Sequence, residues 1–373
     1  MVEDGKFDLT QNVNQVLSSW EVPENEFTQK NKVTLKGILS HTAGLTVQGF
    51  RGYSTDEEIP TLQNILDGSS PANSDSIRVD LEPGSENRYS GGGYTVMQQL
   101  LEDVTGERFD KLLQDTVLKT LDMQNSTFEQ PLPKQYRERA ALAHDGKGNP
   151  IEGKWHTYPE KAAAGLWTTS TDLAKFAIEV MKSSKGHSNK ILSAKIVNEM
   201  LAPIKDDFGL GFITKQVNGS CRFGHPGSNE GFRCYFVAYT KSGQGAVVMT
   251  NGENGDLLTM EIIRSIANVY DWSDFQPQDK SIVTVTPEIY LQYEGSYALP
   301  EWPDFVVQVK RKESQLLIEI ARSALRFEIY PESETKYFSL EMESSIEFIQ
   351  NEYGVFNSMR FGPERILLER VEE

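Results

Sequence analysis

The chain has 373 residues, of which 38% are hydrophobic, enough to bury the core of one large domain with a smaller one after it. Its net charge of −17 excludes the basic surface that nucleic acids or anionic membranes require. No apolar run reaches about 18 residues, and the first residues, Met1–Lys6, are polar. We therefore expect no membrane segment and no signal peptide, and a cytoplasmic location for the chain as written.

The cysteines and histidines do not have the spacing of a metal site. Two cysteines, Cys221 and Cys234, are too few for a disulfide framework or a zinc cage. They fall on runs expected to be adjacent strands, so a cross-strand disulfide is possible, although we favour two buried thiols. The glycines at 91–93 do not fit a dinucleotide-binding motif, because position 96 is Val. We expect no cofactor.

The first half of the chain is predicted to be mainly helical. Apolar residues at helical spacing predict helices over 8–19, 33–39, 94–105 and 109–121. Another helix should begin with Ser170 or Thr171 as its cap. Between Gln48 and Asp80 the sequence is rich in Gly, Pro, Ser and Asp, which indicates a long ordered excursion.

Strands dominate the second half. Runs over 221–225, 232–240 and 245–250, joined by short Gly-containing turns, predict an antiparallel sheet with an apolar helix over 257–270 covering one face. Polar residues 271–280 have no apolar period and indicate a linker. Beyond Pro287, seven or eight runs of β-branched and aromatic residues follow at even spacing, which is typical of a small meander barrel. The predicted domains are 1–275 and 285–373.

One stretch looks like the centre of a functional site. Arg88–Tyr94 leads into the helix over 94–105, which should end at Gly106. A turn at Pro83-Gly84 precedes it, and three consecutive glycines allow the backbone to pass close to a neighbour at an entropic cost that a plain connection would avoid.

The triplet Tyr89-Ser90-Gly91 resembles the second motif of the serine β-lactamase and penicillin-binding-protein-like hydrolases, in the Tyr-Ser-Asn form of class C enzymes, related esterases and D-aminopeptidases. Leu39–Leu45 upstream and Phe223–Gly227 downstream agree in order and spacing. Tyr293–Tyr297 resembles the opening of the lipocalin-like domain that follows many of these hydrolases. The resemblance implies a mixed α/β (α+β) fold: an antiparallel sheet flanked by helices, an all-helical lobe, and a C-terminal β-barrel.

Members of that family transfer acyl groups with a Ser-x-x-Lys nucleophile, a tyrosine or serine motif, and a Lys-Thr-Gly-like strand. By resemblance, Tyr89 is the general base or proton shuttle and His225 occupies the lysine position of the third motif. A histidine is a weaker, pH-dependent cation, which favours an esterase or D-amino-acid peptidase over a β-lactamase. Gly91 departs from the usual asparagine, which puts in doubt the substrate amide contact that the asparagine side chain makes in the family. Substrate-binding positions implied are Ser90, Gly91, Pro226, Gly227, Ser228 and Asn229.

The nucleophile motif is the main departure. The only Ser-x-x-Lys in the chain is Ser333–Lys336, within the predicted barrel, where it is a chance match. We expect the catalytic serine to lie upstream of Met1, and this chain alone to be inactive toward a small-molecule or peptide-like substrate. The alternative is a non-catalytic binding or remnant protein that keeps only the cleft. His41 is interpreted as structural, as a cap of the helix that contains Lys36. Trp167 is interpreted as a core residue, with a place in the cleft wall left open.

Overall fold

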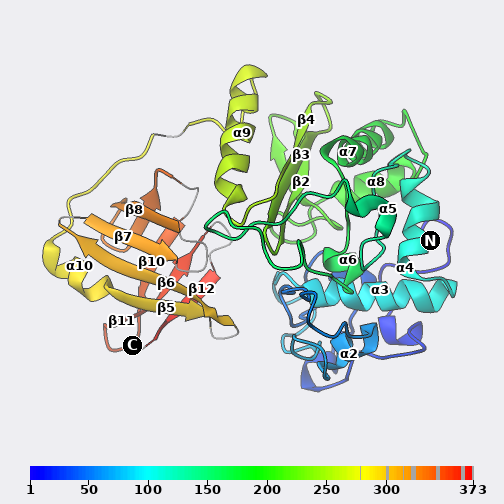
Figure 1. Cartoon of the computed structure of the whole chain (residues 1–373), viewed down its shortest axis with the longest axis horizontal. Coiled ribbons are helices and arrows are strands. Elements are labelled where there is room, and N and C mark those ends of the chain that lie inside the picture. Colours follow the sequence, from blue (N-terminus) through cyan, green and yellow to red (C-terminus); the bar gives the residue numbers. More distant parts are fainter. Residues whose placement is uncertain are drawn as a thin grey trace. The chain divides into compact units, whose positions relative to one another are not determined.

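A computed structural model of the chain describes residues 1–373 except 278, 300–301, 314, 321–324, 342–344, 363–365 and 372–373. The chain folds into two compact units (Figure 1). The first contains residues 1–143 and 150–251, and the second contains residues 144–149 and 252–373. The division into domains 1–275 and 285–373 stays a prediction.

The first unit contains the predicted helical lobe. Its helices are α1 (Leu35–Leu39), α2 (Leu62–Asp67), α3 (Gly91–Thr105), α4 (Phe109–Leu113), α5 (Lys134–Arg137) and α6 (Lys161–Ala164). The lobe also contains the 3₁₀ helices η1 (Val13–Gln15) and η2 (Glu26–Thr28) and the π-helix η3 (Gln114–Leu118). The helix predicted over 8–19 is wrong, because only η1 forms there. The Val13 amide donates to the Val33 carbonyl at 2.9 Å, so this segment pairs with a distant one instead of coiling on itself.

Helix α3 forms as predicted. Its N-terminal cap is Ser90, whose hydroxyl accepts the Gly93 amide hydrogen at 2.9 Å. The helix ends at Gly106, which has the left-handed φ of 68° that glycine adopts without strain. Val96 and Leu100 are fully buried in the core of the lobe. The packing of this apolar stripe therefore fixes where the start of α3 lies.

The rest of the first unit is a four-stranded antiparallel sheet in the order β1-β2-β3-β4. Its strands are β1 (Ile213–Val217), β2 (Ser220–Asn229), β3 (Phe232–Tyr239) and β4 (Gly245–Thr250), and two helices, α7 (Ser170–Ser184) and α8 (Ala194–Leu201), pack against it. Val180 of α7 and Leu201 of α8 share an apolar cluster with Phe223 and Phe236 of the sheet. The cap of α7 is Thr169, one residue before the predicted position, because the Thr169 hydroxyl accepts the Asp172 amide.

Both cysteines are free thiols. The register of β2 on β3 places Cys234 opposite Gly227, whereas Cys221 lies near the other end of β2. The cross-strand disulfide that the sequence leaves possible is therefore not formed. Burial raises the pKa of the Cys221 thiol, which lowers its thiolate fraction and its reactivity.

The second unit contains helices α9 (Gly255–Val269) and α10 (Pro287–Tyr293) and a closed barrel of eight antiparallel strands. The strands are β5 (Gly295–Leu299), β6 (Trp302–Lys312), β7 (Gln315–Ile320), β8 (Leu325–Pro331), β9 (Lys336–Ser339), β10 (Ser345–Gln350), β11 (Phe356–Phe361) and β12 (Ile366–Val371). Strand β9 pairs with β10, and β12 pairs with β5, which closes the barrel. The predicted C-terminal barrel is therefore confirmed.

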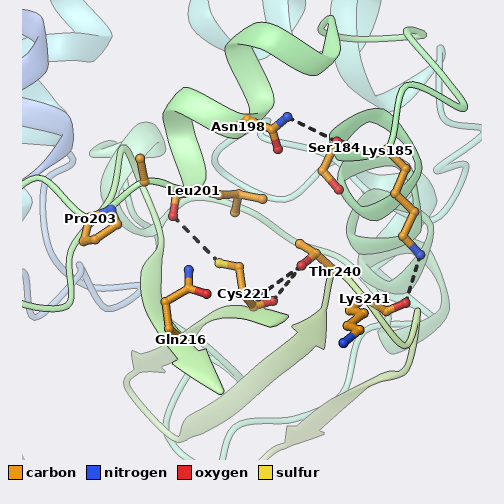
Figure 2. A pocket seen from close by; sticks show the side chains of 10 residues that line it. Ser184, Lys185, Asn198, Leu201, Pro203, Gln216, Cys221, Thr240 and Lys241 are labelled. Carbon is orange, nitrogen blue, oxygen red and sulfur yellow. Dashed lines mark hydrogen bonds between the residues drawn. The ribbon is translucent and has the colours of Figure 1, made fainter. Parts of the chain in front are cut away.

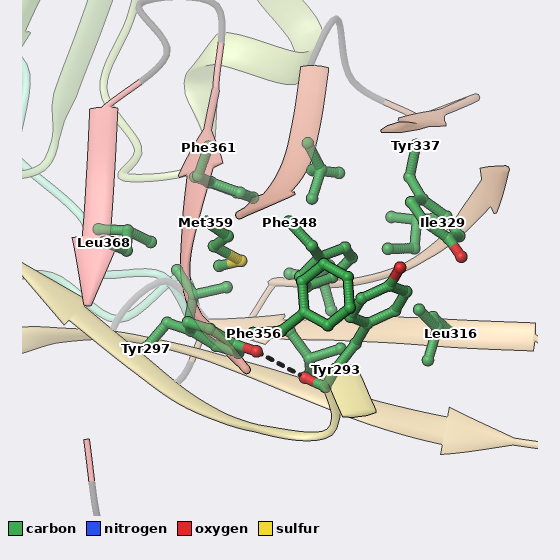
Figure 3. Packing of buried hydrophobic residues seen from close by; sticks show 14 of the residues in the cluster. Tyr293, Tyr297, Leu316, Ile329, Tyr337, Phe348, Phe356, Met359, Phe361 and Leu368 are labelled. Atoms are coloured by element: carbon green, nitrogen blue, oxygen red, sulfur yellow. Dashed lines mark hydrogen bonds between the residues drawn. The ribbon is translucent and has the colours of Figure 1, made fainter. Parts of the chain in front are cut away.

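Aromatic side chains fill much of the barrel interior (Figure 3). The Tyr293 and Phe348 rings stack with their centroids 4.0 Å apart, and Tyr337 meets Phe348 edge-on at 5.5 Å. The Tyr297 hydroxyl donates to the Tyr293 carbonyl at 2.9 Å. These contacts make the interior a packed core of the kind that small eight-stranded barrels have.

The segment between α9 and α10 supplies a test of the predicted domain division. Residues 279–284 are all exposed, and the ion pair of Lys280 with Glu332 is exposed as well, so Lys280 offers a tryptic site. We expect limited trypsin to cut after Lys280 and release a β-rich fragment of roughly 10 kDa, because exposed irregular backbone enters a protease readily. Mass spectrometry checks this. An intact Lys280 bond alongside cuts within the barrel would contradict an independent C-terminal domain.

Candidate functional site

Four aromatic rings from separate segments meet in the first unit. The Tyr89 ring lies 4.2 Å from the His41 ring, with 30° between their planes, and 5.8 Å from the His225 ring. Phe208 packs edge-on against His41 at 5.3 Å. The structure thus brings together Tyr89 and His225, the two residues predicted to be catalytic. Their roles stay predictions.

Hydrogen bonds hold the Tyr89 motif to the segment that follows α1. The Arg88 amide donates to the His41 carbonyl at 2.8 Å, and the Ser90 amide donates to His41 Nδ1 at 3.0 Å. The Arg88 guanidinium also donates to the Gly44 carbonyl at 2.8 Å. Tyr89 therefore lies between two anchored residues, which fixes its backbone beside the His41 ring.

Residues 46–48, the support loop, lie beneath the start of α3. The three carbonyls of the loop accept hydrogen bonds as follows: Thr46 O from Ser90 Oγ at 2.8 Å, Val47 O from Gly92 N at 2.9 Å, and Gln48 O from Gly91 N at 3.0 Å. These bonds satisfy donors that the first turn of a helix otherwise leaves unpaired. Ser90 and Gly91 thus have defined roles in the framework, and their contact with substrate stays a prediction.

The close approach of the support loop explains one glycine of the triplet. A Cβ on Gly92 would lie 2.5 Å from the Thr46 carbonyl oxygen, whereas a Cβ on Gly93 would have only ordinary contacts of 3.4 Å or more. We expect Gly92→Ala to lower the free energy of unfolding by about 2 kcal/mol through overpacking. Gly93→Ala, the matched control, should be neutral or stabilising by up to about 1 kcal/mol. Urea unfolding of both variants measures this, and equal stabilities would contradict it.

The third predicted motif, Phe223–Gly227, and the predicted substrate-binding residues that follow it lie in the part of β2 that runs from Phe223 to the end of the strand. Successive side chains of a strand point to opposite faces, so His225, Gly227 and Asn229 share the face that also carries the buried Phe223. Pro226 and Ser228 point to the other face and are exposed. The structure therefore divides the predicted substrate-binding residues between two faces of the strand, and their contact with substrate stays a prediction.

The end of β2 is attached to the lobe. The Asn229 side chain donates to the Ala164 carbonyl at the end of α6, at 2.9 Å. The Glu230 amide donates to the Tyr158 hydroxyl at 2.8 Å. The strand that carries His225 is thus tied to the residues on either side of α6.

Both site histidines are neutral at pH 7. Burial lowers the pKa of His225, which is half-buried, and a hydrogen bond with the Pro226 carbonyl at 2.6 Å opposes that shift. Because a carbonyl can only accept, Nδ1 of His225 carries the proton and Nε2 carries the lone pair. His225 is therefore a hydrogen-bonding base at this pH, and not the weak cation that the sequence suggests.

His41 is held in the opposite tautomer. Burial and the charge of His225 lower the pKa of His41 to about 3. Its Nδ1 accepts the Ser90 amide hydrogen, so the proton of the neutral ring is on Nε2. A second proton on Nδ1 would break that hydrogen bond, which is a physical reason for the low pKa. The ring is 3% exposed.

The contact of His41 with Tyr89 is the main feature that sequence reasoning missed. The sequence suggested that His41 caps the helix near Lys36. In the structure α1 ends at Leu39 with Ser40 as its C-cap, and His41 turns the chain with a left-handed φ of 56°. Its place within the Leu39–Leu45 motif was the available signal. Phe208 and Tyr158 carried no sequence signal.

An open groove of about 430 Å³ lies elsewhere in the first unit, where α7 and α8 approach strands β1–β3 (Figure 2). Lys185, Asn198, Cys221 and Lys241 line it, and none of the predicted site residues does. Within the described part of the chain, no group of three or more His, Cys, Asp or Glu side chains is arranged to hold a metal ion. None of the described helices is long and apolar enough to cross a membrane.

Comparison with known proteins matches the sequence to a protein family. Residues 1–269 match the family model described as Beta-lactamase. A Salmonella typhimurium protein, whose name assigns it D-alanyl-D-alanine carboxypeptidase activity, is 25% identical over 251 residues, which cover 59% of this chain. The chain spans 55% of the length of that relative.

Two further comparisons extend over the barrel. Penicillin-binding protein 4* of Bacillus subtilis is 21% identical over 347 residues, which cover 86% of this chain and 74% of that protein. The crystal structure of SurE with D-Leu superposes on 99% of this chain and 83% of its own, with a TM-score of 0.58 and 17% identity. This likeness shows a shared fold.

Proposed function

We propose an activity from one premise: the chain belongs to the Beta-lactamase family. The chain forms the acid–base and substrate-binding side of a serine hydrolase site that cleaves ester or amide bonds next to a D-amino acid. The observation that carries this proposal is the contact of Tyr89 with His225, at 5.8 Å between ring centroids. The relative named for D-alanyl-D-alanine supports the D-amino-acid preference.

The site supports proton transfer during acyl transfer. A serine Oγ attacks the substrate carbonyl and gives its proton to the Tyr89 oxygen, while Tyr89 passes its own hydroxyl proton to Nε2 of His225. One proton then returns through Tyr89 to the leaving alcohol or amine. Neutral His225 keeps a lone pair on Nε2 with which it can share the proton of Tyr89. Water then repeats the sequence on the acyl-enzyme, which releases the acid and restores the serine. The burial of His41 beside Tyr89 keeps that ring neutral, so it adds no positive charge to the site.

The serine itself is not assigned within this site. Ser333 of the only Ser-x-x-Lys sequence lies in the turn between β8 and β9 of the barrel, where its hydroxyl accepts the Lys336 amide hydrogen at 3.0 Å. Ser90 Oγ already accepts the Gly93 amide hydrogen and donates to the Thr46 carbonyl. We therefore propose that the nucleophile comes from sequence outside residues 1–373, and that this chain alone does not turn over.

The test compares two polypeptides, namely residues 1–373 and the same chain extended by the in-frame coding sequence that precedes Met1. A serine-directed fluorophosphonate should label only the extended form. That form should also hydrolyse a nitrophenyl ester, and an N-acyl-D-alanyl peptide faster than its L-alanyl counterpart. Ser333→Ala, the control, should change neither result. Labelling of residues 1–373 at Ser333 would overturn the assignment.

A second candidate is a binding protein that keeps only the cleft, and the misplaced Ser-x-x-Lys motif favours it. The two candidates differ in the genomic sequence upstream of Met1. An in-frame Ser-x-x-Lys within a few tens of residues favours the hydrolase, whereas stop codons there favour the binding protein. In the second case the chain should bind an acyl-D-alanine ligand without cleaving it, which calorimetry and product analysis together measure.

A further inference from the structure

Tyr158 links the two parts of the candidate site. Its side chain is 3% exposed, and its hydroxyl accepts the Glu230 amide hydrogen at 2.8 Å. The same hydroxyl donates to the Arg51 carbonyl at 3.3 Å. Glu230 directly follows β2, which carries His225, and Arg51 follows the support loop. One hydroxyl therefore bridges the backbones of two segments that are far apart in the sequence.

From this bridge we infer that Tyr158 is a positioning residue, which sets the distance between the support loop beneath the Tyr89 motif and the strand that carries His225. The inference rests on the proposed function, since it assigns Tyr158 a role in the same site. Tyr158 acts through the two backbones that it holds, and it is not itself placed among the reacting groups.

The Tyr158 ring is fixed independently of its hydroxyl. Gly52 has a left-handed φ of 70°, and a Cβ there would lie 2.5 Å from Cζ of the Tyr158 ring, so only glycine lets the ring lie this close. The neighbouring residues Tyr53 and Thr157 exchange two backbone hydrogen bonds, both of 2.8 Å. The ring is thus clamped against residues 51–53, and its hydroxyl is presented to Glu230.

The bridge continues to both predicted catalytic residues. On one side, the support loop accepts the Gly91 and Gly92 amides that begin α3, directly after the Tyr89 motif. On the other side, the second attachment of β2, from Asn229 to Ala164, lies four residues beyond His225. The Tyr158 hydroxyl joins the two sides directly, through the Glu230 amide and the Arg51 carbonyl. Its loss should let the end of β2 move relative to the support loop.

The test uses Tyr158→Phe, which keeps the ring and removes only the hydroxyl. Tyr53→Phe is the matched control, because the buried Tyr53 hydroxyl also accepts one backbone amide, from Asn73 at 3.1 Å, but has no bond to β2. In residues 1–373, we expect Tyr158→Phe to shift the ¹⁵N signals of the His225 ring and to speed amide exchange at Gly91 and Gly92 about tenfold. Tyr53→Phe should change neither.

A second pair of variants tests the contact between the Tyr158 ring and residues 51–53. Gly52→Ala should displace the Tyr158 ring and reproduce the His225 shift, whereas Gly49→Ala, whose Cβ would meet nothing within 4 Å, should not. This pair decides the question if Tyr158→Phe fails to fold. Unchanged His225 signals in every folded variant of Tyr158 and Gly52 would overturn the inference.

Kinetics separate this inference from the proposed function. In the hydrolytic form of the protein, Tyr158→Phe should lower kcat about tenfold with little change in KM, because the hydroxyl orients catalytic groups and does not bind substrate. If no form hydrolyses the ester, the proposed function fails, and the magnetic resonance result still decides the positioning role. A rise in KM at unchanged kcat would assign Tyr158 to substrate binding and overturn the inference.

Discussion

In the hydrolytic form of the protein, Tyr89→Phe is expected to lower kcat by about 10² or more, the usual weight of a positioned general acid or base. The phenyl ring keeps the contacts with His41 and His225, at 4.2 and 5.8 Å between ring centroids. Only the hydroxyl is lost, and with it the group that carries the proton. KM should change little, because the interaction removed matters mainly in the transition state.

The control for this variant is again Tyr53→Phe, a hydroxyl deletion at a buried tyrosine of the same lobe, which should stay within about twofold of the parent in kcat. Thermal unfolding of both variants checks that each is folded. A Tyr89→Phe protein with full turnover would remove Tyr89 from the mechanism and leave the contact of its ring with His225 as packing.

The architecture was predictable because periodicity and turn residues report on local structure. The stripe that ends at Gly106 identified α3, and evenly spaced β-runs identified the barrel. The predicted helix over 8–19 failed for a reason that sequence does not display: Val13 pairs with Val33, twenty positions away. Apolar spacing cannot tell a helix from a segment whose backbone donors are satisfied by a distant strand-like partner.

Sequence reasoning identified site residues only where they belong to a recognisable motif. The resemblance pointed to Tyr89 and His225, which lie far apart in the sequence and meet in the structure. Their protonation states were not predictable, since they depend on which backbone group each ring nitrogen meets: Ser90 N–H for His41 and Pro226 C=O for His225. Tyr158 belongs to no motif, and its role emerges only from two hydrogen bonds in space.

Glu160, two residues after Tyr158 in the sequence, carries a buried carboxyl whose ionisation should have a large effect on stability. Glu160 is 0% exposed, and neither carboxyl oxygen has a hydrogen-bond partner among the described residues. Burial raises the pKa of Glu160 to about 7 from its usual 4.5. The titratable groups near it, Tyr53 and Tyr158, have raised pKa values and remain uncharged phenols at neutral pH. Within the described part of the chain, the Glu160 carboxylate therefore has no hydrogen-bonded cation beside it above pH 7.

The sign of the pH dependence follows from linkage. Between pH 4.5 and 7 the folded chain keeps a proton on Glu160 that the unfolded chain releases. The contribution of Glu160 to the free energy of unfolding is therefore complete below pH 4.5 and is lost as pH rises through 7. His41 acts in the opposite direction, because its pKa falls to about 3 on folding. Its contribution is complete above pH 6.5 and is lost as pH falls toward 3. The two slopes oppose each other between pH 4.5 and 6.5.

We therefore expect Glu160→Gln to raise the free energy of unfolding at pH 8 by roughly 2 to 3 kcal/mol, because it removes a buried charge without changing side-chain volume. The gain should disappear near pH 4.5. Between pH 4.5 and 6.5 the stability of the variant should rise with pH through the two site histidines, His41 and His225, and His41 by itself approaches about 1.4 kcal/mol per pH unit. Urea unfolding measured across this pH range provides both results.

The matched control is Glu179→Gln, because Glu179 is also a buried glutamate but its carboxylate has hydrogen-bond partners. The Glu179 carboxylate is 6% exposed and accepts hydrogen bonds from Ser183, from Ser188 and from the Lys190 amide. Replacing it removes acceptors that are in use, so Glu179→Gln should destabilise the protein at pH 8, opposite in sign to Glu160→Gln. If Glu160→Gln also destabilises at pH 8, the Glu160 carboxylate has a compensating partner in solution. That result would contradict the view that the Glu160 carboxyl is buried without a partner.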